Sequence, residues 1–190
     1  MRTQYYTAAT LDGFIATEDD SLDWLFPLAD PEQTSYPAFI AEVGALAMGA
    51  STYLWLLEHL AHPPADQPAE PWPYAQPAWV FTNRTLPRAA DGDIRFVHGD
   101  VRPVHAQMRA VAGGKNLWIV GGGELAAAFL DAGLLDELIV QIGSVTLGRG
   151  KPLLPRRLLA PTLRLVDVRQ YGAGLAELRY EIDRKAAVAP

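Results

Sequence analysis

The chain contains no cysteine among its 190 residues. This absence excludes a disulfide framework, a thiolate nucleophile, and a zinc or iron-sulfur site held by cysteine. Any redox chemistry therefore requires a bound cofactor.

Basic residues and long apolar runs are also scarce. Sixteen lysines and arginines face 22 acidic residues, which gives a net charge of −6 and argues against nucleic acid or an anionic membrane as a partner. No run reaches the ~18 apolar residues of a membrane span, and residues 1–6 lack the apolar stretch of a secretory signal. We expect a cytoplasmic protein with a small-molecule substrate and no nucleic-acid or membrane partner.

Short apolar runs alternate with segments of helical spacing, which predicts an α/β fold with a mostly parallel sheet and helices on both faces. Residues 163–182 form two alternating runs around a glycine turn and predict an antiparallel C-terminal hairpin at the sheet edge. The predicted strands cover 4–9, 45–48, 78–81, 94–97, 116–120 and 137–142, and the predicted helices 38–43, 52–60, 103–111 and 125–130.

The length favours one domain, which we place at residues 1–185 with a tail at 186–190. The segment 62–77 carries too many prolines for a regular element, so it predicts a surface loop, with a domain linker as the alternative. The long segment 10–31 predicts an irregular lid over a site.

Three glycines join a predicted strand to a predicted helix. Val120 ends the strand, Gly121, Gly122 and Gly123 follow, and Glu124 and Leu125 open the helix. Free N–H groups and the helix dipole at such a place favour an anion such as a dinucleotide pyrophosphate. The alternative is a tight turn that needs only one of the glycines. Glu124 would have to point away from a bound phosphate.

Two further predicted strands end in small polar residues. Gly49 is followed by Ser51 and Thr52, which either cap the next helix or also face the dinucleotide. Thr82, Asn83 and Arg84 follow the strand at 78–81. Ligands of open α/β sheets collect along the carboxyl edge, so we expect these strand ends to share one site.

Several motifs in this order resemble the reductase domain of the bifunctional riboflavin-biosynthesis deaminase-reductases, a family that is itself dihydrofolate-reductase-like. The matching segments are 10–16, 21–25, 48–53, 80–84, 120–123, 135–138 and 147–154. The resemblance covers nearly the whole chain. It implies a three-layer dihydrofolate-reductase-like fold, NADPH as cofactor, a homodimer, and an activity similar to 5-amino-6-(5-phosphoribosylamino)uracil reductase.

The resemblance also implies where the cofactor lies. The three glycines and Thr52 would hold the pyrophosphate, and Thr82, Asn83 and Arg84 would lie near the adenosine ribose and its 2′-phosphate. Backbone near Ala8, together with Ile15 and Ala16, would surround the nicotinamide.

Three departures from the family pattern weaken parts of this assignment. Ala50 and Ser51 stand where a basic pair usually follows Gly49, so NADH becomes possible beside NADPH, with Arg84 as compensation. Phe14 replaces the usual lysine after Asp-Gly, which removes a partner for a phosphorylated substrate. Ser35 occupies the place of the carboxylate that dihydrofolate reductases use, and no deaminase signature occurs in the chain.

Catalytic candidates are few, because the cofactor would supply the hydride. Asp12 could contact substrate or relay a proton, or it could simply close an Asp-Gly turn. Asp23 and Trp24 lie in the expected lid, where Trp24 could wall a planar ring or only pack the loop. His59 and His62 lack a third ligand, so we predict no metal site.

Three functions stay open at this point. The first is an NAD(P)H-dependent reductase acting on a small heterocyclic or carbonyl-like substrate, with Trp24 and Ser35 as candidate substrate contacts. The second is dihydrofolate reduction, which requires a carboxylate inside the pocket near Ser35. The third is a non-catalytic nucleotide-binding protein on the same scaffold.

Overall fold

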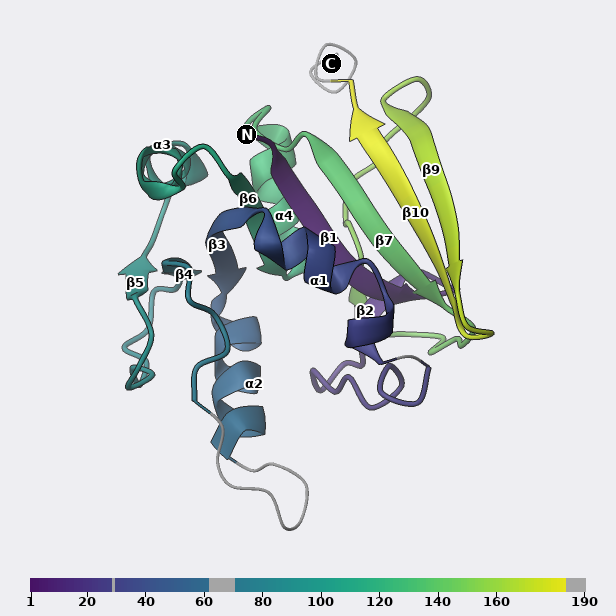
Figure 1. The fold of residues 1–190 in the computed structure, drawn as a ribbon, viewed down its shortest axis with the longest axis horizontal. Coiled ribbons are helices and arrows are strands. Elements are labelled where there is room, and N and C mark those ends of the chain that lie inside the picture. Colours follow the sequence, from purple (N-terminus) through teal and green to yellow (C-terminus); the bar gives the residue numbers. More distant parts are fainter. Residues whose placement is uncertain (29, 62–70, 184–190) are drawn as a thin grey trace.

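The computed structural model describes residues 1–28, 30–61 and 71–183, and their centre is an eight-stranded sheet in the order β5-β4-β3-β6-β1-β7-β10-β9 (Figure 1). The six strands β5, β4, β3, β6, β1 and β7 run parallel to one another, whereas β10 is antiparallel to both β7 and β9. The bounds are β1 Thr3–Thr10, β3 Val43–Gly49, β4 Ala78–Phe81, β5 Ile94–Val97, β6 Asn116–Gly121, β7 Glu137–Gly143, β9 Leu163–Tyr171 and β10 Leu175–Ile182.

Helices cover both faces of this sheet, so the fold has three layers. Two neighbouring residues of β1 contact the helices on opposite faces. Tyr5 packs in the hydrophobic cluster that contains residues of α3 and α4, and Tyr6 packs in the hydrophobic cluster that contains residues of α1 and α2. Alternate strand residues point to opposite faces, and both tyrosines are buried. The helices are α1 Tyr36–Ala41, α2 Ala50–Ala61, α3 Val101–Val111 and α4 Gly123–Asp131, with a short 3₁₀ turn, η1, at Pro31–Gln33.

The α/β class, the mostly parallel sheet and the C-terminal hairpin are confirmed. The helix predicted at 38–43 is shifted, because Pro37 fits only the first turn and Val43 already begins β3. The other three helices are found and extend beyond their predicted ranges.

The segment 10–31 is more ordered than the sequence suggests. It contains β2 (Phe14–Ala16), which pairs antiparallel with β8 (Lys151–Pro152) in a separate two-stranded sheet. Of the proline-rich loop, residues 71–77 contain no helix or strand. Residues 62–70 and the tail predicted at 186–190 lie outside the described residues. Within the described ranges, no helix is both long and apolar enough to cross a membrane.

Candidate functional site

A cleft of about 310 Å³ lies where β1, β3 and β6 end and α2 and α4 begin. Parallel strands bring their carboxyl ends to one edge, which is why distant parts of the sequence meet here. The lining combines predicted cofactor residues with residues of the small sheet and the 17–28 segment: Thr7, Ile15, Ala16, Asp20, Leu22, Ser51, Thr52, Trp55, Val120, Gly121, Gly122, Gly123, Glu124, Lys151 and Pro152.

Each glycine of the run has its own structural reason. A Cβ on Gly121 would lie 3.0 Å from Thr52 Oγ1, and a Cβ on Gly123 would lie 2.3 Å from the carbonyl oxygen of Pro152. Gly122 precedes α4 with a φ of 86°, a region that favours glycine. The run therefore serves the close approach of other protein segments, as well as lining the cleft.

Two helix N-termini border the cleft, and their first N–H groups have no intrahelical acceptor. Ser51 and Thr52 come from the first turn of α2, and Gly123 and Glu124 open α4. The Glu124 carboxylate forms an ion pair with Arg156 Nη1 at 3.4 Å, and the Glu124 side chain is largely exposed. Lys151 adds a positive charge to the lining, 3.6 Å from Asp20. This end of the cleft has the donors that an anionic group needs.

A second chamber of about 380 Å³ adjoins the cleft. The two spaces share Thr7, Leu22, Thr52, Trp55 and Val120. The lining of the second chamber contains Ala8 and is mostly apolar or aromatic, and no Asp, Glu, Lys, Arg or His of the described residues contributes to it. Among the described residues, charged side chains thus line the first of these two spaces and not the second.

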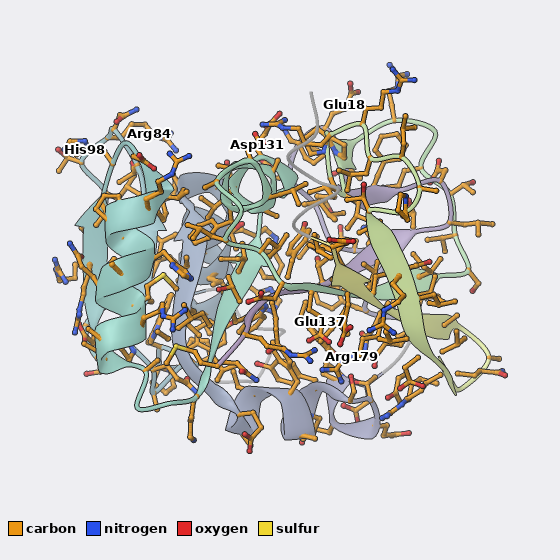
Figure 2. The ribbon with its side chains drawn as sticks, turned by 90° about the horizontal axis from the view of Figure 1, so that it is seen from above. Glu18, Arg84, His98, Asp131, Glu137 and Arg179 are labelled. Carbon is orange, nitrogen blue, oxygen red and sulfur yellow. The ribbon has the colours of Figure 1, made fainter. Side chains whose placement is uncertain are left out.

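A separate hollow of about 440 Å³ lies on the other side of the start of α2. Thr82, Asn83 and Arg84 line it, together with Ala50 and His98. Figure 2 shows Arg84 and His98 at the same corner of the molecule. Because Ala50 directly precedes Ser51 and Thr52, the first turn of α2 separates this hollow from the cleft. Gly49 and Leu125 line neither space.

Asp12 does not line the cleft. Its carboxylate accepts hydrogen bonds from Thr10 Oγ1 at 2.5 Å and from the backbone N–H groups of Leu147, at 3.1 Å, and Gly148, at 2.7 Å. The Thr10 hydroxyl, followed by these backbone groups, lowers the pKa of Asp12. The ionised carboxylate thus links the turn after β1 to the turn before β8. This contact is closer to the predicted turn-closing role of Asp12 than to a substrate contact.

The lid candidates also lie outside the cleft lining. Asp23 is exposed, and its backbone N–H binds Ser21 Oγ. The Trp24 ring packs where Gly143 lacks a side chain, since a Cβ there would lie 2.9 Å from ring atom Cζ3. The side chain that walls the cleft is instead Trp55, whose ring stacks on His59 at 4.8 Å. His62 falls outside the described residues.

Ser35 belongs to a buried polar network that the sequence did not predict. Its hydroxyl donates to the Glu177 carboxylate and lies 3.2 Å from the Tyr6 hydroxyl. Gln141 Nε2 donates to Tyr6 Oη at 2.7 Å and to Glu177 Oε2 at 3.0 Å. Burial raises the pKa of Tyr6 to about 12, so its hydroxyl keeps its proton. A carboxylate thus lies next to Ser35, although it comes from β10 rather than from the first helix.

Comparisons with known proteins agree with this geometry. The family model of the RibD C-terminal domain matches residues 3–176. Uncharacterized protein YwjB of Bacillus subtilis (strain 168) is 31% identical over 179 residues, 94% of this chain and 97% of that protein.

Two solved structures share the fold. A "Putative riboflavin biosynthesis protein" from Shewanella sp. PV-4 has 26% identity and a TM-score of 0.77, over 96% of this chain and 99% of that one. Dihydrofolate reductase from Enterococcus faecalis, complexed with NADP(H), has 15% identity and a TM-score of 0.60, over 96% of each chain.

Proposed function

Because the chain belongs to the RibD C-terminal domain family, we propose that it is a cytoplasmic NADPH-dependent oxidoreductase that reduces a small heterocyclic or carbonyl-like substrate. The observation that carries the proposal is the cleft at the carboxyl ends of β1, β3 and β6, bordered by two helix N-termini. When bound, the nicotinamide would supply the hydride.

The chain's own residues would bind and orient the cofactor along one path. The N–H groups at Gly122–Glu124 and the first turn of α2, with Lys151, suit the pyrophosphate. Ile15 and Ala16 line the cleft beside these groups, and Ala8 lines the adjoining second chamber, as expected for contacts to the nicotinamide. The hollow at Arg84 suits a ribose carrying a 2′-phosphate.

Arg84 should decide the choice between the two nicotinamide cofactors. Arg84→Ala is expected to weaken NADPH binding by about tenfold, the loss of one charge-assisted contact to the 2′-phosphate, and to leave NADH binding unchanged. Titration of tryptophan fluorescence with each cofactor measures both effects. Arg109→Ala, at an exposed arginine in the last turn of α3, is the matched control. Equal losses for both cofactors in Arg84→Ala would refute the assignment, and no NADPH binding by the unaltered protein would refute the function.

We also propose that two copies pair through β9. This strand is the outer edge of the sheet, and it exposes the apolar side chains of Leu165, Val166 and Val168. An exposed apolar edge strand favours association. Sedimentation velocity should give a dimer for the unaltered chain and a monomer for a Leu165→Lys/Val168→Lys double variant. A monomeric unaltered chain at micromolar concentration contradicts the proposal.

A further inference from the structure

A buried network fixes the orientation of the Gln141 amide, which lines the second chamber. A carboxylate can only accept hydrogen bonds, so the Gln141 atom next to Glu177 must be the amide nitrogen. That nitrogen has two hydrogens, and both are used: one toward Glu177 Oε2 and one toward Tyr6 Oη. The carbonyl oxygen Oε1 is therefore the polar atom that Gln141 keeps for a ligand.

The rest of the network prevents the amide from turning over. Ser35 gives its single hydrogen to Glu177, so the Tyr6 hydroxyl donates to Ser35 and accepts from Gln141. Glu177 is 5% exposed and Gln141 is 7% exposed. Rotating the amide would place Oε1 against the buried carboxylate, which costs a lost hydrogen bond and adds repulsion.

The other walls of the second chamber limit what could bind there. Tyr36, Tyr74, Trp55 and Trp118 supply flat aromatic surface, several leucines add apolar surface, and the described lining contains no charged side chain. Such walls suit a planar uncharged ring and offer no cation for a phosphate.

We propose that Gln141 is a specificity-determining residue, held by Glu177, which presents a hydrogen-bond acceptor to a planar, uncharged heterocycle carrying an N–H group. The inference rests on the proposed reductase function and deepens it, since it names the residue that selects the substrate in the same site. Gln141 would touch the ligand, and Glu177 is a positioning residue that acts through it.

Indole and benzofuran test this inference, because they have the same shape and differ by an N–H against an oxygen. We expect Gln141→Met to reduce the preference for indole, measured as the ratio of the two dissociation constants from NMR titration, by about fivefold, the value of one net hydrogen bond. Comparing ratios cancels the different hydrophobicity of the two rings. Gln107→Met, at an exposed glutamine of α3 on the opposite face of the sheet, should leave the ratio unchanged.

Glu177→Gln provides a second test if the first variant does not fold. A carboxamide at 177 can donate to Gln141 Oε1, so the amide of Gln141 is free to turn and the preference for indole should fall. An unchanged ratio in the folded variants, or no binding of either ring at millimolar concentration, overturns the inference. NADPH is titrated separately. If the unaltered chain does not bind NADPH, the reductase proposal is refuted, whereas the ratio of the dissociation constants of indole and benzofuran still decides the role of Gln141.

Discussion

Glu137→Gln should lower the free energy of unfolding by about 3 kcal/mol, because the buried carboxylate loses its charge-assisted hydrogen bonds to arginine. The Glu137 side chain is fully buried on β7. It accepts from Arg179 at 2.6 and 2.9 Å and from Gln4 Nε2 at 2.5 Å, and Arg2 lies 3.1 Å away. Figure 2 shows Glu137 and Arg179 side by side. For a chain of this size the melting temperature should fall by about 6–12 °C.

Glu181→Gln is the matched control for this variant, because Glu181 also contacts Arg2, at 3.1 Å, but is partly exposed on β10. Its effect should stay below about 1 kcal/mol. Equal melting temperatures for the two variants would contradict the buried role of Glu137.

The Glu137 carboxylate should also make the free energy of unfolding depend on pH. Burial is the strongest single influence on Glu137 and opposes its ionisation, but the hydrogen bonds and charges of its neighbours, Arg179 foremost, outweigh it and lower the pKa below the ordinary 4.5. The stabilisation is therefore fully present above pH 4.5 and lost as pH falls through the lower folded value. Unfolding curves between neutral and acidic pH should show a smaller drop in the Glu137→Gln variant than in the unaltered chain.

Gly123→Ala should destabilise the chain by at least about 3 kcal/mol, at the upper end of overpacking effects. The added Cβ would lie 2.3 Å from the Pro152 carbonyl oxygen and 2.7 Å from that of Leu153, and neither backbone group can rotate away. Thermal unfolding followed by circular dichroism measures the loss.

Gly49→Ala is the control for this second variant. Gly49 ends β3 with open space where a Cβ would be and without a positive φ. The change should stay within about 0.5 kcal/mol. If Gly123→Ala were as stable as Gly49→Ala, the close packing of β8 on the glycine run would be wrong.

The main sheet and the glycine-lined edge could be predicted, because buried parallel strands are continuous apolar runs and glycines mark their ends. The small sheet could not, since strands as short as β2 and β8 show no periodicity. The sequence also did not show why the glycines at 121–123 are needed for packing. The sequence suggested space for a ligand, whereas Gly121 and Gly123 also make room for Thr52 and Pro152.

The polar network escaped prediction for a different reason. Glu177 lies among polar and apolar residues that alternate along β10, a pattern typical of a strand with one solvent face, and Gln141 is a single polar residue in the apolar run of β7. Only the packing of Tyr6 and Ser35 over that face shows that both are buried. Ser35 itself was singled out by its position in the family pattern, and its carboxylate partner comes from 142 residues further along the chain.

The uneven distribution of charge between the two adjoining spaces has a consequence for the direction in which a ligand lies. Asp20, Glu124 and Lys151 line the cleft, whereas the described lining of the second chamber has no charged side chain. A molecule with one ionic end is expected to keep that end beside the charged side chains, since placing it against apolar walls would cost hydration that nothing replaces. Its uncharged end would then occupy the second chamber, so the polarity of the lining alone excludes the reversed orientation.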